Sequence, residues 1–188
     1  MKQITFLLLI VLGIFFYINY LRKSIYLSYV KTNSGNKYLV RKLDDNIQAA
    51  EYLDDLSQSL TKLVNSVKNK KKEGVDRLYK NFDPDNITEN IPGSSYVAYS
   101  VNKGEELSIC IRDKNTEKFI DKNTVMFVAI HELSHMMTID DGHTKEFWDN
   151  MKFLLLEANK LGIYQIIDYR KNPTTYCGMT IDNTPLDL

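Results

Sequence analysis

The chain has 188 residues, a formal net charge of zero and an apolar fraction of 44%. These values are typical of a globular domain; they exclude a disordered chain and give no indication of a nucleic-acid partner. There are only two cysteines, Cys110 and Cys177, and no CxxC pair. A disulfide scaffold is therefore not expected, and the composition fits a reducing compartment.

The first segment of the chain is an apolar run without charge, residues 4–21. As a helix it would rise about 27 Å, close to the thickness of a hydrocarbon core. No A-x-A-like cleavage site follows it, and it has no polar face. We therefore predict a single-pass transmembrane anchor over residues 1–23, rather than a signal peptide or a buried helix. Cations are more numerous after the run than before it, which favours a cytoplasmic position for the remainder.

The remainder is predicted to form one α+β domain over residues 43–188, after a linker or short extended pieces over 24–42. From Leu43 to Val67 an apolar residue recurs at every third or fourth position. This spacing predicts one long amphipathic helix. A short helix over 75–82 and a loop with two prolines should follow.

The middle of the chain contains two runs rich in β-branched or aromatic residues, Tyr96–Val101 and Glu106–Arg112. They flank an Asn-Lys-Gly turn and predict a β-hairpin. Residues 123–138 are apolar on almost every side and predict a central, buried helix. A last amphipathic helix over about 144–161 should precede an irregular tail.

All three histidines lie within 13 positions, and the first two belong to the sequence His131-Glu132-Leu133-Ser134-His135. Residues four apart share one face of a helix, so both imidazoles can bind one metal ion. Zinc acidifies a bound water, and Glu132 can take its proton as general base. The sequence predicts two zinc ligands and one catalytic residue here. The alternative is a pair of hydrogen-bonded core histidines.

A catalytic zinc site needs a third protein ligand. His143 is the first candidate, because it follows a turn in which Gly142 can adopt a positive φ and return the chain to the helix. A Cys177 thiolate would bind the zinc and block its open position, although a buried structural cysteine is the simpler interpretation. The remaining alternatives are nearby carboxylates: Asp140, Asp141, Glu146, Asp149 and Glu157.

Two further features have candidate roles in substrate binding. The run Glu106–Arg112 is the predicted strand nearest to the histidines in sequence, so it is the candidate edge for pairing with an extended peptide. Tyr176 is one of twelve tyrosines, any of which can donate a hydrogen bond to an oxyanion.

The stretch HELSHMMTIDDGHTKEFW and the tail YCGM resemble the WLM family of zinc metallopeptidases, relatives of the SprT-like proteases. The likeness is to the short form encoded by large DNA viruses, and it covers about Tyr96 to Thr180. It implies a compact α+β, zincin-like fold in which His131, His135 and His143 bind zinc and Glu132 is the general base. The third histidine stands further from the second than in the familiar WLM pattern, as in the SprT-like group.

The predicted function is that of a membrane-anchored, zinc-dependent metalloendopeptidase acting on a protein or peptide substrate. If the chain is viral, the membrane would be that of the virion or the host. The alternative function is a catalytically inactive zinc-binding or interaction module held at a membrane. Glu132 separates the two hypotheses, because a purely structural zinc site does not need it. No nucleic-acid partner is predicted.

Overall fold

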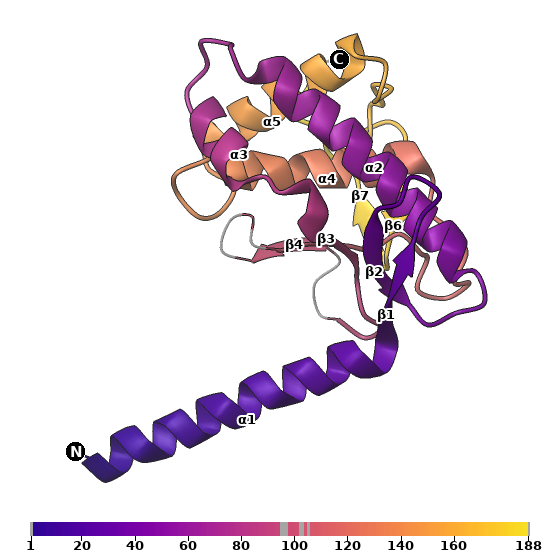
Figure 1. The fold of residues 1–188 in the computed structure, drawn as a ribbon. Helices are drawn as coiled ribbons and strands as arrows, with labels where there is room; N and C mark the ends of the chain where they lie inside the picture. The colour runs from indigo at the N-terminus through magenta and orange to yellow at the C-terminus, as the bar shows by residue number, and fades with distance from the viewer. Residues whose placement is uncertain (1, 95–97, 102–103, 105, 188) are drawn as a thin grey trace.

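The computed structural model describes residues 2–94, 98–101, 104 and 106–187. Figure 1 shows a sheet with helices packed on it, and one N-terminal helix, α1 (Lys2–Tyr26), that extends away from them. The elements that follow α1 are β1 (Leu27–Lys31), β2 (Lys37–Arg41), α2 (Asn46–Val67), α3 (Val75–Asn81), the 3-10 turn η1 (Pro84–Asn86), β3 (Ile87–Glu89), β4 (Ala98–Val101), β5 (Glu106–Ile109), α4 (Lys122–Met137), α5 (Lys145–Lys160), β6 (Thr174–Tyr176) and β7 (Met179–Ile181).

The N-terminal apolar run forms α1, as a helix was predicted there. However, no helix in the described part of the chain has both the length and the apolarity that crossing a membrane requires, so the predicted transmembrane anchor is not supported. The helix also continues past residue 23, and its last turns contact the domain. The Lys42 ammonium donates a hydrogen bond to the Ser24 carbonyl at 2.6 Å, and Lys23 pairs with Glu106.

The main sheet has five strands in the order β1-β2-β3-β5-β4. β2, β3 and β5 are mutually parallel, whereas β1 and β4 pair antiparallel with their neighbours. Parallel neighbours need a long crossover, which α2 and α3 provide between β2 and β3. Of the two alternatives predicted for residues 24–42, a linker or short extended pieces, the structure has the extended pieces: these residues complete α1 and form the β1–β2 hairpin. β3 lies in the segment predicted to be a loop.

The predicted hairpin over residues 96–112 is confirmed where it is described, because β4 pairs antiparallel with β5. Tyr96, Val97 and the turn at 102–103 lie outside the described residues. β5 lies between β3 and β4, so strands occupy both of its edges. β4 has one strand neighbour in the described sheet.

The core lies between the sheet and three helices. α2 contacts β1, β2 and β3, α4 contacts β4 and β5, and α5 packs on α2 and α4. α4 is buried almost all round, as its sequence predicted. α5 has nearly the predicted bounds, and α2 begins three residues later than predicted, at Asn46. Full burial of one leucine stabilises the fold by about 2 kcal/mol, and many leucines of these helices are fully buried, including Leu53, Leu60, Leu63, Leu154 and Leu155.

The C-terminal tail was predicted to be irregular, but it forms the β6–β7 hairpin next to α4 (Figure 1). A disulfide between Cys110 and Cys177 ties this hairpin to the end of β5. The two Cα atoms are 6.3 Å apart, within the range that a disulfide spans. The composition predicted only that a disulfide scaffold is absent; this one disulfide was not predicted, because the tail returns to a segment 67 residues earlier.

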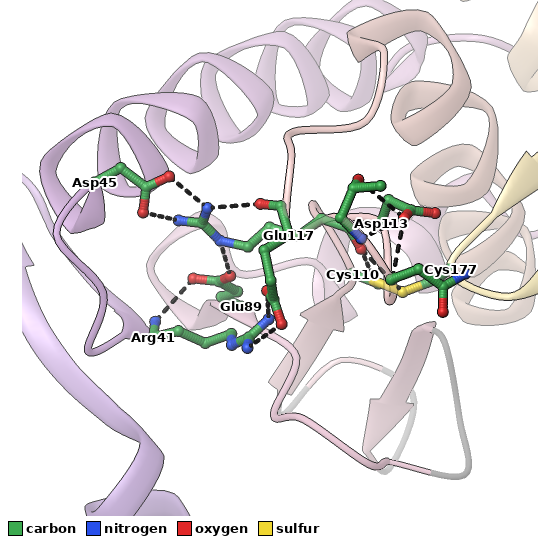
Figure 2. A network of polar contacts seen from close by, with 10 residues as sticks. Arg41, Asp45, Glu89, Cys110, Asp113, Glu117 and Cys177 are labelled. Carbon is green, nitrogen blue, oxygen red and sulfur yellow. Dashed lines mark hydrogen bonds and ion pairs between the residues drawn. A yellow bond between two sulfur atoms is a disulfide. The ribbon is translucent and has the colours of Figure 1, made fainter.

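A polar network around the buried Arg112 and Glu89 joins the start of α2 to the sheet (Figure 2). The Arg112 guanidinium, only 2% exposed, donates to Glu89 at 2.8 Å and to both oxygens of Asp45 at 2.6 and 2.8 Å. The Arg41 backbone amide also donates to Glu89, and the Arg41 side chain pairs with Glu117. Burial raises the pKa of Glu89, and its contacts with both arginines oppose this rise.

Candidate metal and catalytic site

The first part of the site is one face of α4, which carries His131 and His135 one turn apart. Their Nε2 atoms are 3.2 Å apart. The helix ends directly after this pair, where the Thr138 amide and hydroxyl both donate to the Ser134 carbonyl, at 3.1 and 2.7 Å. The Asn150 side chain of α5 donates to the Thr138 hydroxyl at 3.0 Å, which fixes the end of α4 against α5.

The second part of the site is the turn between α4 and α5. Gly142 has a φ of +93°, the left-handed conformation that was predicted for it. Thr144 caps α5 by accepting a hydrogen bond from the Phe147 amide. Between these two residues, the chain returns to α4 and places the His143 Nε2 3.0 Å from the His131 Nε2.

The three imidazoles converge closely enough to share a metal ion. Their ligand nitrogens all lie within 4.8 Å of one another. A tetrahedral zinc site with Zn–N bonds of 2.0–2.1 Å has N···N edges of about 3.3 Å, close to the two observed separations of 3.0 and 3.2 Å. His131 and His135 are half-buried and His143 is exposed. The donor set therefore fits zinc and faces solvent on one side.

The alternative ligands lie elsewhere. Asp140 and Asp141 are exposed in the turn and are not part of the convergent group. Cys177 belongs to the disulfide and has no thiolate to offer. Cations engage the other carboxylates: Arg77 binds Glu146 at 2.8 Å, Lys145 binds Asp149 at 2.7 Å and Lys70 binds Glu157 at 2.7 Å.

An aromatic floor lies beneath the imidazoles. The Phe147 ring is fully buried, and its centroid lies 4.8, 4.4 and 4.7 Å from those of His131, His135 and His143. Trp148 contacts His143 from the surface, at 5.5 Å. Packed rings restrict imidazole rotation, so α5 helps to orient all three nitrogens. The sequence assigned Phe147 only to the inner face of its helix; the contact depends on the turn before it.

Glu132 lies directly after His131 and is only 8% exposed. Burial raises the pKa of Glu132 to about 7, and a hydrogen bond from the Ser100 backbone amide opposes this rise. Burial also lowers the pKa of His131 to about 3, together with the charges of His135 and His143. The His131 imidazole is thus neutral near pH 7, the form that binds a metal.

The strand beside this site is β4, since β4 contributes Ser100 and contacts α4. The prediction that residues 106–112 provide a free edge is wrong, because β5 is an interior strand. A hairpin signal in the sequence does not say which arm pairs with the rest of the sheet. Tyr176, the suggested oxyanion donor, is fully buried and does not reach the solvent-facing side of the site.

Residues 32–184 match the family model of the WLM domain. The chain belongs to the WLM domain family. It is 31% identical to an uncharacterized protein of Acanthamoeba polyphaga mimivirus over 94% of this chain and 92% of that protein. It is also 40% identical to an uncharacterized protein of Invertebrate iridescent virus 3, over 36% of this chain and 42% of that protein. The resemblance to short WLM proteins encoded by large DNA viruses, inferred from the HExxH stretch and the YCGM tail, is thereby confirmed.

Among solved structures, Wss1 from Saccharomyces cerevisiae has the same fold as this WLM domain. The TM-score is 0.52 at 16% identity, over 70% of this chain and 90% of that chain. The compact α+β fold is thus confirmed. The WLM match begins at residue 32, well before the residue 96 that the sequence motifs indicated. The domain begins earlier than the motifs because β2, α2 and β3 complete the sheet and the core on which α4 packs.

Proposed function

We propose that this WLM domain is a zinc-dependent endopeptidase in which His131, His135 and His143 hold the metal and Glu132 is the general base. The observation that carries the proposal is the convergence of three Nε2 atoms from α4 and the following turn, with a buried glutamate beside them. A structural zinc site is usually closed by four protein ligands. Among the described residues this group offers three, which leaves a position for water or substrate.

Glu132 has the properties of a base that works near neutral pH. When bound, zinc supplies a Lewis acid that polarises a substrate carbonyl and makes a water molecule more acidic. With a pKa raised by burial to about 7, the Glu132 carboxylate can take the proton of the attacking water. It can then return that proton to the leaving amine nitrogen. The hydrogen bond from Ser100 holds the carboxylate while this happens.

The substrate proposed is a protein segment in an extended conformation. β4 offers the edge, since it has one neighbour in the described sheet and lies against α4. A peptide that adds to this edge gains main-chain hydrogen bonds independent of its side chains. It would run past the imidazoles, with its carbonyl groups spaced along the strand. Recognition of this kind favours unfolded or unstructured substrates.

The test compares the full chain with Glu132→Gln, using zinc content and cleavage of an unfolded protein as readouts. Loss of a general base lowers turnover about 10²- to 10⁴-fold, and the zinc content should not change. Glu146→Gln is the matched control. Glu146 pairs with Arg77 and is not part of the proposed site, so this variant should keep wild-type activity. Undiminished turnover in Glu132→Gln would disprove the base assignment. A zinc-loaded wild type without peptidase activity would instead favour the inactive zinc-binding module.

A further inference from the structure

Trp148 is the only tryptophan of the chain, and its side chain is 36% exposed. It lies on the first turn of α5, and its ring centroid is 5.5 Å from that of the proposed zinc ligand His143. A single exposed apolar side chain needs no explanation on an ordinary surface. This one borders the three imidazoles, so its exposure is relevant to what binds there.

The covered part of the Trp148 ring has a structural role. Because Thr144 caps α5, His143 is the residue before the cap and Trp148 is the fourth residue of the helix. A contact between these two positions corresponds to the hydrophobic staple, which fixes the angle at which the chain enters a helix. The ring also meets Phe147 edge-on, with centroids 5.0 Å apart. Smaller apolar side chains also form such staples, so this role does not require the exposed part of the indole.

The exposed part of the ring adds to the apolar surface of the segments that flank His143 in the chain. Ile139, in the turn between α4 and α5, is 57% exposed, and His143 is itself exposed later in the same turn. Tryptophan is enriched at binding surfaces because its ring offers a large, rigid contact area. The solvent-facing side of the candidate metal site therefore combines ligand nitrogens with apolar surface.

The geometry of an extended substrate indicates what meets this surface. α4 contacts both β4 and α5, and it lies between them in Figure 1. Side chains of a peptide added to β4 would alternate between the two faces of the sheet, and those on one face point towards the helices. In recognition of this kind, contacts to alternate side chains supply the specificity. A side chain next to the scissile bond that points towards the helices would meet the start of α5.

Building on the proposed function, we propose that Trp148 is a specificity-determining residue that selects a large apolar or aromatic side chain next to the scissile bond. The exposed part of the indole packs on that side chain, while β4 holds the main chain of the substrate. Large apolar residues are mostly buried in folded proteins. The substrate class is therefore unfolded protein whose core residues have become exposed.

The chain provides a matched control in Leu156. It lies on the same helix as Trp148 and has nearly the same exposure, 38%. It stands eight residues further along α5, which is about 12 Å along the helix axis. Replacing either residue with alanine removes one exposed apolar side chain from α5. Only Trp148→Ala removes a side chain that contacts a proposed zinc ligand.

The first experiment measures a ratio of rates with full-length, zinc-loaded protein. A bond that the wild type cleaves in an unfolded protein is placed in synthetic peptides that carry phenylalanine or alanine at either flanking position. At one of these positions, kcat/KM of the wild type should be about ten-fold or more higher for phenylalanine. Trp148→Ala should lose most of this preference, Trp148→Phe should keep part of it, and Leu156→Ala should keep all of it.

The ratio separates a substrate contact from a purely structural role of Trp148. Within one variant, the zinc content and the folded fraction affect both rates equally and cancel in the ratio. Loss of the staple alone would therefore lower both rates and leave the preference unchanged. An unchanged preference in Trp148→Ala, or a wild type without any preference, would overturn the proposal.

A second readout does not depend on peptidase activity. Because Trp148 is the only indole, selectively excited fluorescence of full-length, zinc-loaded Glu132→Gln reports this residue alone. The protein is titrated with two peptides of one serine- and threonine-rich sequence that differ in a central phenylalanine or alanine. The phenylalanine peptide should bind more tightly and shift the emission to shorter wavelength, since the indole leaves water. No shift, or equal shifts and affinities for both peptides, overturns the proposal. If the shift occurs but the wild type cleaves no peptide, the proposed function fails and the contact stands.

Discussion

Neutral imidazoles can be brought together at a site where three cations would repel one another. Burial, followed by the charges of His135 and His143, lowers the pKa of His131 to about 3. The His131 imidazole of the metal-free protein is therefore already in the neutral form that binds a zinc ion. The Phe147 floor keeps the rings packed, so little reorganisation is needed when a metal binds.

His143 is the proposed zinc ligand that the sequence determined least, because it stands eight positions after His135. We expect His143→Ala to lower zinc affinity by more than the roughly 10- to 100-fold that loss of a supporting partner costs. Glu146→Gln should bind zinc as the wild type does, since Arg77 engages Glu146. Competition with a chromophoric chelator measures both affinities. Wild-type zinc binding by His143→Ala, together with a loss in Glu146→Gln, would reassign the third ligand.

The pH dependence of stability provides a second residue-scale prediction for the metal-free protein. The folded pKa of His131, about 3, lies below its usual 6.5, so the stability it contributes is lost as pH falls below 6.5. The folded pKa of Glu132, about 7, lies above its usual 4.5, so its contribution is complete below 4.5 and is lost as pH rises through 7. Between pH 7 and 5 the two contributions oppose each other.

The unfolding free energies of variants at these two positions should therefore change with pH in opposite directions. As the pH is lowered from 7 to 5, the unfolding free energy of Glu132→Gln should fall and that of His131→Gln should rise. Each change should be on the order of 1 kcal/mol, and the wild type should change less than either. Urea unfolding with a metal chelator present measures all three. Other titrating groups are common to the three proteins, so identical slopes would contradict the assigned pKa shifts.

At the scale of elements, long periodic segments could be predicted from the sequence and short strands could not. α4 and α5 have the predicted positions because their apolar spacing extends over 16 residues each. β3 has three residues, too few for any alternation to stand out from a loop. The free edge of the sheet was assigned to the wrong arm of a correctly predicted hairpin. Strand order depends on long-range pairing, which local spacing does not encode.

The Arg112 network supplies the prediction at this scale. Arg112→Met leaves Glu89 buried without its cation, which should cost about 3–5 kcal/mol of unfolding free energy. Adding Glu89→Met should recover much of this loss, because two apolar side chains then replace the ion pair. Lys122→Met is the control: its pair with Asp55 is exposed, so the change should stay below about 1 kcal/mol. Equal losses in the single and double variants would contradict this account of the network.

At the scale of the whole molecule, the domain depends on contacts between distant segments, which cannot be predicted from any one segment of the sequence. The candidate site is formed by α4, the turn before α5, and β4. The histidine cluster could be predicted because its three members are close in sequence. The Cys110–Cys177 pair was not, because its 67-residue separation carries no local signature. The N-terminal run was correctly predicted to be helical, but its assignment as a membrane span is not supported.

The disulfide provides the whole-molecule prediction. Closing a loop of this length should stabilise the fold by about 4 kcal/mol, through the entropy of the unfolded chain. Reduction, or the double variant Cys110→Ala/Cys177→Ala, should therefore lower the melting temperature. Amide exchange should increase most over residues 174–181, whereas zinc content should be kept, because the proposed ligands lie on α4 and its turn. Equal melting temperatures for oxidised and reduced protein would mean that β6 and β7 are held by packing alone.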